Sequence, residues 1–165
     1  MPHQPVIDGF EFASAGATQR GIWPLKELPR LRDMLAHDAG EVAYEIAGVR
    51  DERGRPDLRL KVSGTLVLRC QRCLEPMEFE VDTDEKLVLA ATLEEIHAEP
   101  ADTRAPNRVV AGKEMALGEL IEDELILALP FAPRHEDCTA AGLGDGDSGQ
   151  SPFAALRGLI RVARG

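Results

Sequence analysis

The 165-residue chain has few aromatic residues and a deficit of positive charge. One Trp, one Tyr and five Phe are present, and the most basic stretch, residues 50–72, contains none of them. A platform on which single-stranded RNA bases could stack is therefore not expected. With 19 Lys and Arg against 29 Asp and Glu, the net charge is −10. This charge opposes broad, nonspecific contact with a phosphate backbone and makes a basic protein the easier partner.

Long apolar runs and known catalytic motifs are also missing. No apolar run approaches the ~20 residues that span a bilayer, and residues 1–5 lack the charged and apolar regions of a signal peptide. We therefore expect a cytoplasmic protein with no membrane partner. The sequence has no phosphate-binding glycine loop, no Gly-x-Ser-x-Gly elbow and no His-Glu-x-x-His pair. A nuclease-type metal cluster of Glu122, Asp123 and Glu124 is disfavoured because consecutive helical residues point in different directions. The sequence predicts that the protein is not an enzyme.

Alternating apolar residues predict a sheet. They occur around 42–46, 58–68 and 79–89, and the residues from 51 to 56 have turn composition. Gly64, inside the second run, is typical of a bulge or a sharp bend. We expect an antiparallel meander of about four or five strands. One further edge strand is expected at the N-terminus, from Val6, Ile7, Phe10 and Phe12.

Two stripes of apolar residues at helical spacing predict helices. The first predicts a helix from about 27 to 38, and the second, over 117–128, ends at Pro130. The first stripe consists of Leu25, Leu28, Leu31 and Leu35. Residues 97–113 contain two prolines and predict a long loop. The fold class expected is α+β, a meandering antiparallel sheet packed with two or three helices.

Composition predicts three regions along the chain. Residues 1–138 are expected to form a single domain, and residues 139–150, rich in Gly, Asp and Ser, a flexible linker. Residues 151–165 predict a short C-terminal helix, with Ser151 as N-cap and Pro152 at the first helical position.

Three cysteines and one histidine form a candidate metal site. Cys70 and Cys73 are separated by two residues at the corner between two predicted strands, and His135 and Cys138 are the other candidate ligands. Two cysteines at this spacing can converge on one ion at ~2.3 Å, and a set of three Cys and one His completes a tetrahedral zinc site. Such a site has no open position, so the Zn²⁺ would be structural.

Two alternatives to zinc remain open. A thioredoxin-like redox pair needs its first thiol at a helix N-terminus, but Pro76 and the strand pattern after Cys73 argue against that placement. Unpaired structural thiols are the other alternative. Whether His135 and Cys138 approach the first pair depends on the fold.

Charge is distributed unevenly along the chain. Residues 50–72 carry seven basic and three acidic residues, whereas residues 75–102 carry ten acidic residues and one lysine. Arg69 and Arg72, beside the cysteine pair, are candidate RNA-binding residues. On the helix over 117–128, an acidic face is the candidate binding surface for a partner protein. It consists of Glu119, Glu122 and Asp123. We interpret Glu122 and Asp123 as solvated charges and expect Glu124 to be buried. Plain solvated strand faces are the alternative explanation for each charge run.

Three segments of the sequence resemble one family. Residues 62–76 around the cysteine pair, 120–130 in the acidic helix and 151–156 near the C-terminus are similar to the YceD family of bacterial large ribosomal RNA accumulation proteins. The resemblance implies a non-enzymatic factor in the synthesis, processing or stability of 23S rRNA, supporting large-subunit biogenesis. Ribosomal RNA or large-subunit assembly intermediates are the partners implied, with a basic ribosomal protein as a further candidate. The alternative is a zinc-stabilised adaptor that binds a basic ribosomal protein and affects rRNA only indirectly.

Overall fold

A computed structural model describes residues 5–98 and 106–138. The helices and strands, with two short 3-10 turns η1 and η2, follow one another in this order: β1 (Val6–Ile7), α1 (Gly9–Ser14), β2 (Thr18–Pro24), η1 (Leu25–Glu27), η2 (Arg32–Met34), β3 (Glu41–Arg50), β4 (Pro56–Arg69), β5 (Pro76–Ala90), α2 (Leu93–Ala98), β6 (Asn107–Val110), β7 (Met115–Ala116) and α3 (Leu117–Ala128).

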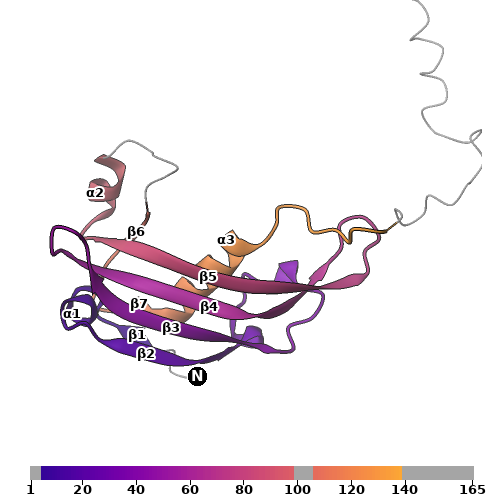
Figure 1. The fold of residues 1–165 in the computed structure, drawn as a ribbon, viewed down its shortest axis with the longest axis horizontal. Helices are drawn as coiled ribbons and strands as arrows, with labels where there is room; N and C mark the ends of the chain where they lie inside the picture. The colour runs from indigo at the N-terminus through magenta and orange to yellow at the C-terminus, as the bar shows by residue number, and fades with distance from the viewer. Residues whose placement is uncertain (1–4, 99–105, 139–165) are drawn as a thin grey trace, which may run out of the picture.

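The sheet has five strands in the order β2-β3-β4-β5-β6, and β1 pairs with β7 in a separate small sheet. Neighbouring strands from β2 to β5 are antiparallel, so the predicted meander and the α+β class are confirmed. Strand β6 adds a parallel edge beside β5. Parallel neighbours need a crossover connection, and α2 lies within it (Figure 1).

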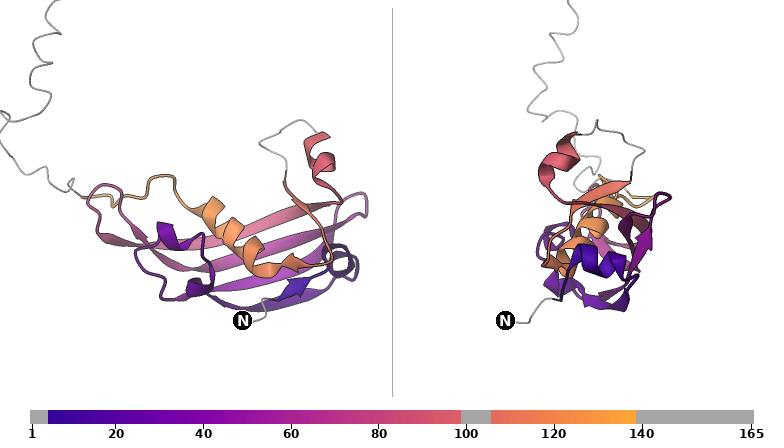
Figure 2. Two further views of the ribbon diagram at one scale, coloured as in Figure 1. Left: turned by 180° about the vertical axis from the view of Figure 1, so that it is seen from behind. Right: turned by 90° about the vertical axis from the view of Figure 1, so that its left-hand side faces the viewer.

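Helix α3 lies across one face of the sheet, and no helix of the described residues covers the other face over its middle (Figure 2). The strands bury the side chains that point toward α3, such as Leu60, Val62 and Leu66 of β4. Leu117, Ile121 and Leu125 of α3 are also buried. The helical apolar stripe and the period-two alternation thus pack against each other and form one core.

The predicted helix over 27–38 is wrong. The chain instead forms the 3-10 turns η1 and η2, and Leu35 bridges to Leu68 of β4. Pro29 has no N–H to donate and disfavours a helical backbone at Leu28 before it, where φ is −110° and ψ is 84°. The four leucines of the stripe are all buried, so the prediction identified core residues and assigned them the wrong backbone.

Other local predictions also need correction. Of the expected N-terminal edge strand only β1 forms, because Asp8 caps α1 by accepting from the Glu11 N–H at 2.9 Å, and Phe10 and Phe12 fall on that helix. The expected loop over 97–113 contains the end of α2 and the whole of β6. Gly64 makes no bulge, since β4 pairs continuously through it with β5, and on the other side it lies directly opposite Val42, where the pairing with β3 ends. The linker and C-terminal helix, over 139–150 and 151–165, lie outside the described residues.

Gly118 lets the first turn of α3 approach the sheet. A Cβ atom at this position would lie 2.6 Å from Cζ2 of the buried Trp23. We expect Gly118→Ala to destabilise the protein by about 1–2 kcal/mol, because overpacking costs more than the helix propensity that Ala gains. Urea unfolding measures this. Gly112→Ala is the control, since its nearest neighbour atom would be 3.9 Å away. A Gly118→Ala variant as stable as the control would contradict the close packing.

Candidate metal centre

The corner between β4 and β5 is a tight turn that carries two thiols, of which Cys70 is buried and Cys73 half-buried. The N–H of Leu74 donates to the Cys70 carbonyl at 3.0 Å, and the N–H of Cys70 donates to the Glu75 carbonyl at 3.0 Å. Leu74 has a φ of 66°, in the left-handed region that residues other than Gly rarely adopt. The two hydrogen bonds span this residue and hold the turn in place. Nothing in the sequence predicts the left-handed conformation of Leu74.

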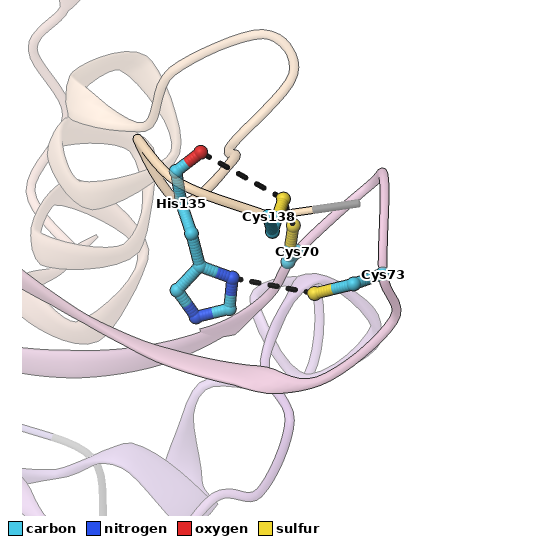
Figure 3. Close-up of side chains that lie close together, drawn as sticks. All are labelled: Cys70, Cys73, His135 and Cys138. Atoms are coloured by element: carbon cyan, nitrogen blue, oxygen red, sulfur yellow. Dashed lines mark hydrogen bonds between the residues drawn. The ribbon is translucent and has the colours of Figure 1, made fainter. Parts of the chain in front are cut away.

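The segment that follows α3 runs back to this corner. After α3 ends, the carbonyl of Pro133 accepts from the Gln71 N–H at 2.8 Å. This contact brings His135 and Cys138 beside the cysteine pair (Figure 3). The structure therefore brings the Cys70–Cys73 pair and the His135–Cys138 pair together, which the sequence could not establish.

The four side chains have the spacing of a tetrahedral site. Cys70 Sγ lies 3.6 Å from Cys138 Sγ, and Cys73 Sγ lies 3.3 Å from His135 Nδ1. All four donor atoms lie within 4.8 Å of one another. A tetrahedron with ~2.3 Å metal–sulfur bonds has edges of about 3.8 Å, so these atoms could bind one metal ion after small shifts.

The imidazole of His135 is oriented by a backbone carbonyl. His135 Nε2 lies 3.2 Å from the Pro76 carbonyl oxygen. Because a carbonyl can only accept, Nε2 carries the proton and Nδ1 presents its lone pair toward the thiols. A second hydrogen bond of this kind is typical of metal-binding histidines. The ligand set and its support therefore fit a metal such as zinc.

The cluster favours one thiolate even without a cation. Burial of Cys70 raises its pKa, but backbone hydrogen bonds from Cys73, Arg72 and His135 outweigh burial and lower the pKa to about 5. The N–H of Arg72 donates to Cys70 Sγ at 3.4 Å. Burial and the neighbouring thiols raise the pKa of Cys138. Thiolates crowded at one point repel one another, and a divalent cation bound between them would offset that repulsion. The thiolate is the form of cysteine that binds metal.

The candidate RNA-binding arginines lie at this corner. Arg69 at the end of β4 and Arg72 in the turn are both exposed. Arg134, which was not predicted as a binding residue, is also exposed and precedes the candidate ligand His135. Its adjacency to a ligand was the available signal, because a metal that held His135 at the corner would bring Arg134 with it.

The interpretation of Glu122 as a solvated charge is wrong. Its side chain is 4% exposed, and one carboxylate oxygen accepts from the backbone N–H of Arg30 at 2.6 Å and of Leu31 at 3.0 Å. The other oxygen accepts from Arg30 Nε at 2.8 Å. Pro29 prevents a helix over this segment, so these two N–H groups have no carbonyl of a preceding helical turn to bond. The carboxylate of Glu122 supplies the acceptor instead. Glu122 therefore cannot serve a partner surface.

The other acidic residues of α3 differ from one another. Glu119 is exposed, and Asp123 is exposed but paired with Arg30 Nη1 at 2.7 Å. Glu124 is buried, as predicted. Burial raises the pKa of Glu124, while a hydrogen bond with Thr83 acts in the opposite direction. Of the candidate partner-binding set, Glu119 and Asp123 remain on the surface.

Comparison with known families identifies the chain. The sequence model of the large ribosomal RNA subunit accumulation protein YceD matches residues 58–159. The chain belongs to the YceD family. No solved structure matches it.

The YceD match spans the whole candidate metal centre and the helix that precedes it. It runs from β4 through the cysteine corner, α3 and the His-Cys segment, and on to residue 159. The family's description names a role in accumulation of large-subunit ribosomal RNA and names no reaction. Among the residues that the structure describes, no helix is long and apolar enough to cross a membrane.

Proposed function

We propose that this YceD protein is a non-enzymatic factor that supports synthesis, processing or stability of 23S rRNA, and that Cys70, Cys73, His135 and Cys138 bind one structural Zn²⁺. The family match over residues 58–159 is the observation that carries the rRNA role. Spacing within 4.8 Å among three thiols and one imidazole supports the zinc site. With four protein ligands, the zinc would have no position for a water or a substrate, so it would stabilise the corner and not act as a catalyst.

The zinc site would join two segments that carry arginines. Arg69 and Arg72 come from the β4–β5 corner, and Arg134 comes from the segment after α3. Within the described ranges, none of the three has an ion pair with an acidic residue. We infer that these arginines are available to contact the phosphates of ribosomal RNA, either free or in a large-subunit assembly intermediate.

The rRNA role is tested by charge reversal at the corner. In cells that lack their own copy of the gene, the variant Arg69→Glu/Arg72→Glu should restore less 23S rRNA than the wild-type chain does. Its thermal unfolding should stay nearly unchanged, because exposed substitutions usually cost under ~0.5 kcal/mol.

The matched control reverses two exposed basic residues away from the corner, Arg53 and Lys113, which also have no ion pair within the described ranges. This control should restore 23S rRNA as the wild type does. Full restoration by the corner variant would show that Arg69 and Arg72 are only solvated charges. Failure of the wild-type chain itself to restore 23S rRNA would contradict the proposed function.

The open face of the sheet favours a second candidate, a zinc-stabilised adaptor for a basic ribosomal protein. Strand β5 presents four exposed acidic residues at alternate positions. They are Glu78, Glu80, Asp82 and Asp84. Asp84 pairs with Arg59, while the other three have no ion pair within the described part of the chain. With a net charge of −10, this face complements a basic surface. If the adaptor is correct, reversing these three charges should abolish capture of a basic large-subunit protein, and reversing Arg69 and Arg72 should not.

A further inference from the structure

The end of α3 and the cysteine corner enclose an apolar groove of about 460 Å³. Seven of its nine lining residues are apolar. The large apolar side chains among them are those of Met34, Leu68, Ile126, Leu129 and Phe131. Leu68 is buried and forms part of the floor, whereas Phe131 is fully exposed and Met34 is 45% exposed. Exposed apolar surface that is concentrated in one groove marks a binding site more often than isolated exposed residues do.

We propose that this groove binds residues 153–160 of the same chain as a short amphipathic helix. Phe153, Leu156 and Ile160 recur at the spacing of one helical face, after an N-cap Ser and a Pro at the first helical position. Three large apolar side chains on one face match the chemistry of the groove lining. The match of the YceD family continues to residue 159, so all of this segment except Ile160 lies in the part of the chain that the family shares.

The position of the groove suits a segment of the same chain. Gln71 lines the groove and directly follows Cys70, whose Sγ lies 3.6 Å from that of Cys138. Cys138 is also the last described residue before residues 139–165. The 14 residues from 139 to 152 are Gly-rich, and a chain of this length and composition can span on the order of 20 Å, which is enough for residue 153 to reach the groove.

Charge also favours this occupant. Residues 151–165 contain three arginines and no acidic residue, whereas the rest of the chain has 16 basic and 29 acidic residues and a net charge of −13. The groove itself includes one acidic residue, Asp33. A basic amphipathic segment is therefore attracted to the acidic body of its own chain.

Hydrogen exchange on the full-length protein tests the proposal. A tether of this length gives an effective concentration on the order of 1 mM, so a segment that binds with Kd ~0.1 mM would slow exchange in the groove roughly tenfold. We expect this protection in peptides covering residues 31–36 and 126–134. The variant Phe153→Asp should lose it, since a charge cannot enter the groove. Ala155→Asp introduces the same charge on the opposite helical face and should keep the protection.

A second pair of variants probes the groove from the other side. Phe131→Ala should speed exchange of residues 153–160 by about tenfold. Leu127→Ala is the control, because Leu127 is 69% exposed on the last turn of α3 but does not line this groove. Equal exchange rates in wild type, Phe153→Asp and Ala155→Asp would overturn the proposal. Protection that disappears on tenfold dilution of the protein would also overturn it, by assigning the bound segment to a second copy. Neither outcome depends on the rRNA role.

Discussion

Replacing Cys70 with Ser should lower the free energy of unfolding by at least about 3 kcal/mol, which corresponds to a fall of about 10 °C in the unfolding midpoint. Cys70 is the fully buried member of the cluster and lies at the junction of β4 and the turn. Zinc bound by four protein ligands stabilises the folded state by mass action, because the unfolded chain does not bring these ligands together.

A chelator separates metal loss from a packing defect. Adding EDTA should lower the unfolding midpoint of the wild-type protein to nearly that of Cys70→Ser and should leave the variant unchanged. Gln71→Ala is the matched control within the same turn, since Gln71 is exposed and is not a ligand. If the midpoint of the wild-type protein does not respond to EDTA, the corner is held by packing and hydrogen bonds alone.

Replacing Glu122 with Ala should cost about 3 kcal/mol of stability. The carboxylate accepts hydrogen bonds from two backbone N–H groups, and one of them, at Leu31, is buried. Bonds to a charged acceptor contribute about 1.5–3 kcal/mol, and a buried donor left without a partner carries a desolvation penalty. Arg30 is half-exposed and can keep its pair with Asp123, so no uncompensated buried charge adds to the cost.

The control for this prediction lies on the same helix. Glu119→Ala removes an exposed carboxylate from the first turn of α3 and should cost no more than about 0.5 kcal/mol through the helix dipole. Urea unfolding of both variants measures the difference. Equal losses in the two variants would mean that the carboxylate of Glu122 adds nothing specific to the fold.

The sequence was most informative where one physical requirement dominates. Period-two alternation over 58–68 and 79–89 predicted β4 and β5, and the helical stripe over 117–128 predicted α3. Each pattern is strong because one face must be buried in the core. The donor set of the candidate metal centre was likewise predicted from ligand chemistry. Its assembly was not, because Cys70 and Cys138 are 68 residues apart and only the fold brings them together.

The sequence-based predictions were wrong where contacts with distant parts of the chain determine the backbone conformation. Strand β2 was missed because Gly21 interrupts the apolar alternation. The structure uses that glycine for close approach, since a Cβ there would lie 2.9 Å from the Tyr44 ring. The helix expected over 27–38 was lost to Pro29 and to the capping carboxylate of Glu122, which is more than ninety residues away. Helical periodicity around α3 could not show that one acidic residue of its polar face contacts a distant turn.

The metal content of the freshly purified full-length protein tests the central claim most directly. Elemental analysis should find about one zinc per chain, and X-ray absorption should show three sulfur neighbours and one nitrogen neighbour. In Cys70→Ser the zinc should fall to a small fraction of one per chain, while Gln71→Ala should keep it. A wild-type protein that contains no zinc and takes up none when refolded with it would contradict the claim that these four residues form a structural metal site.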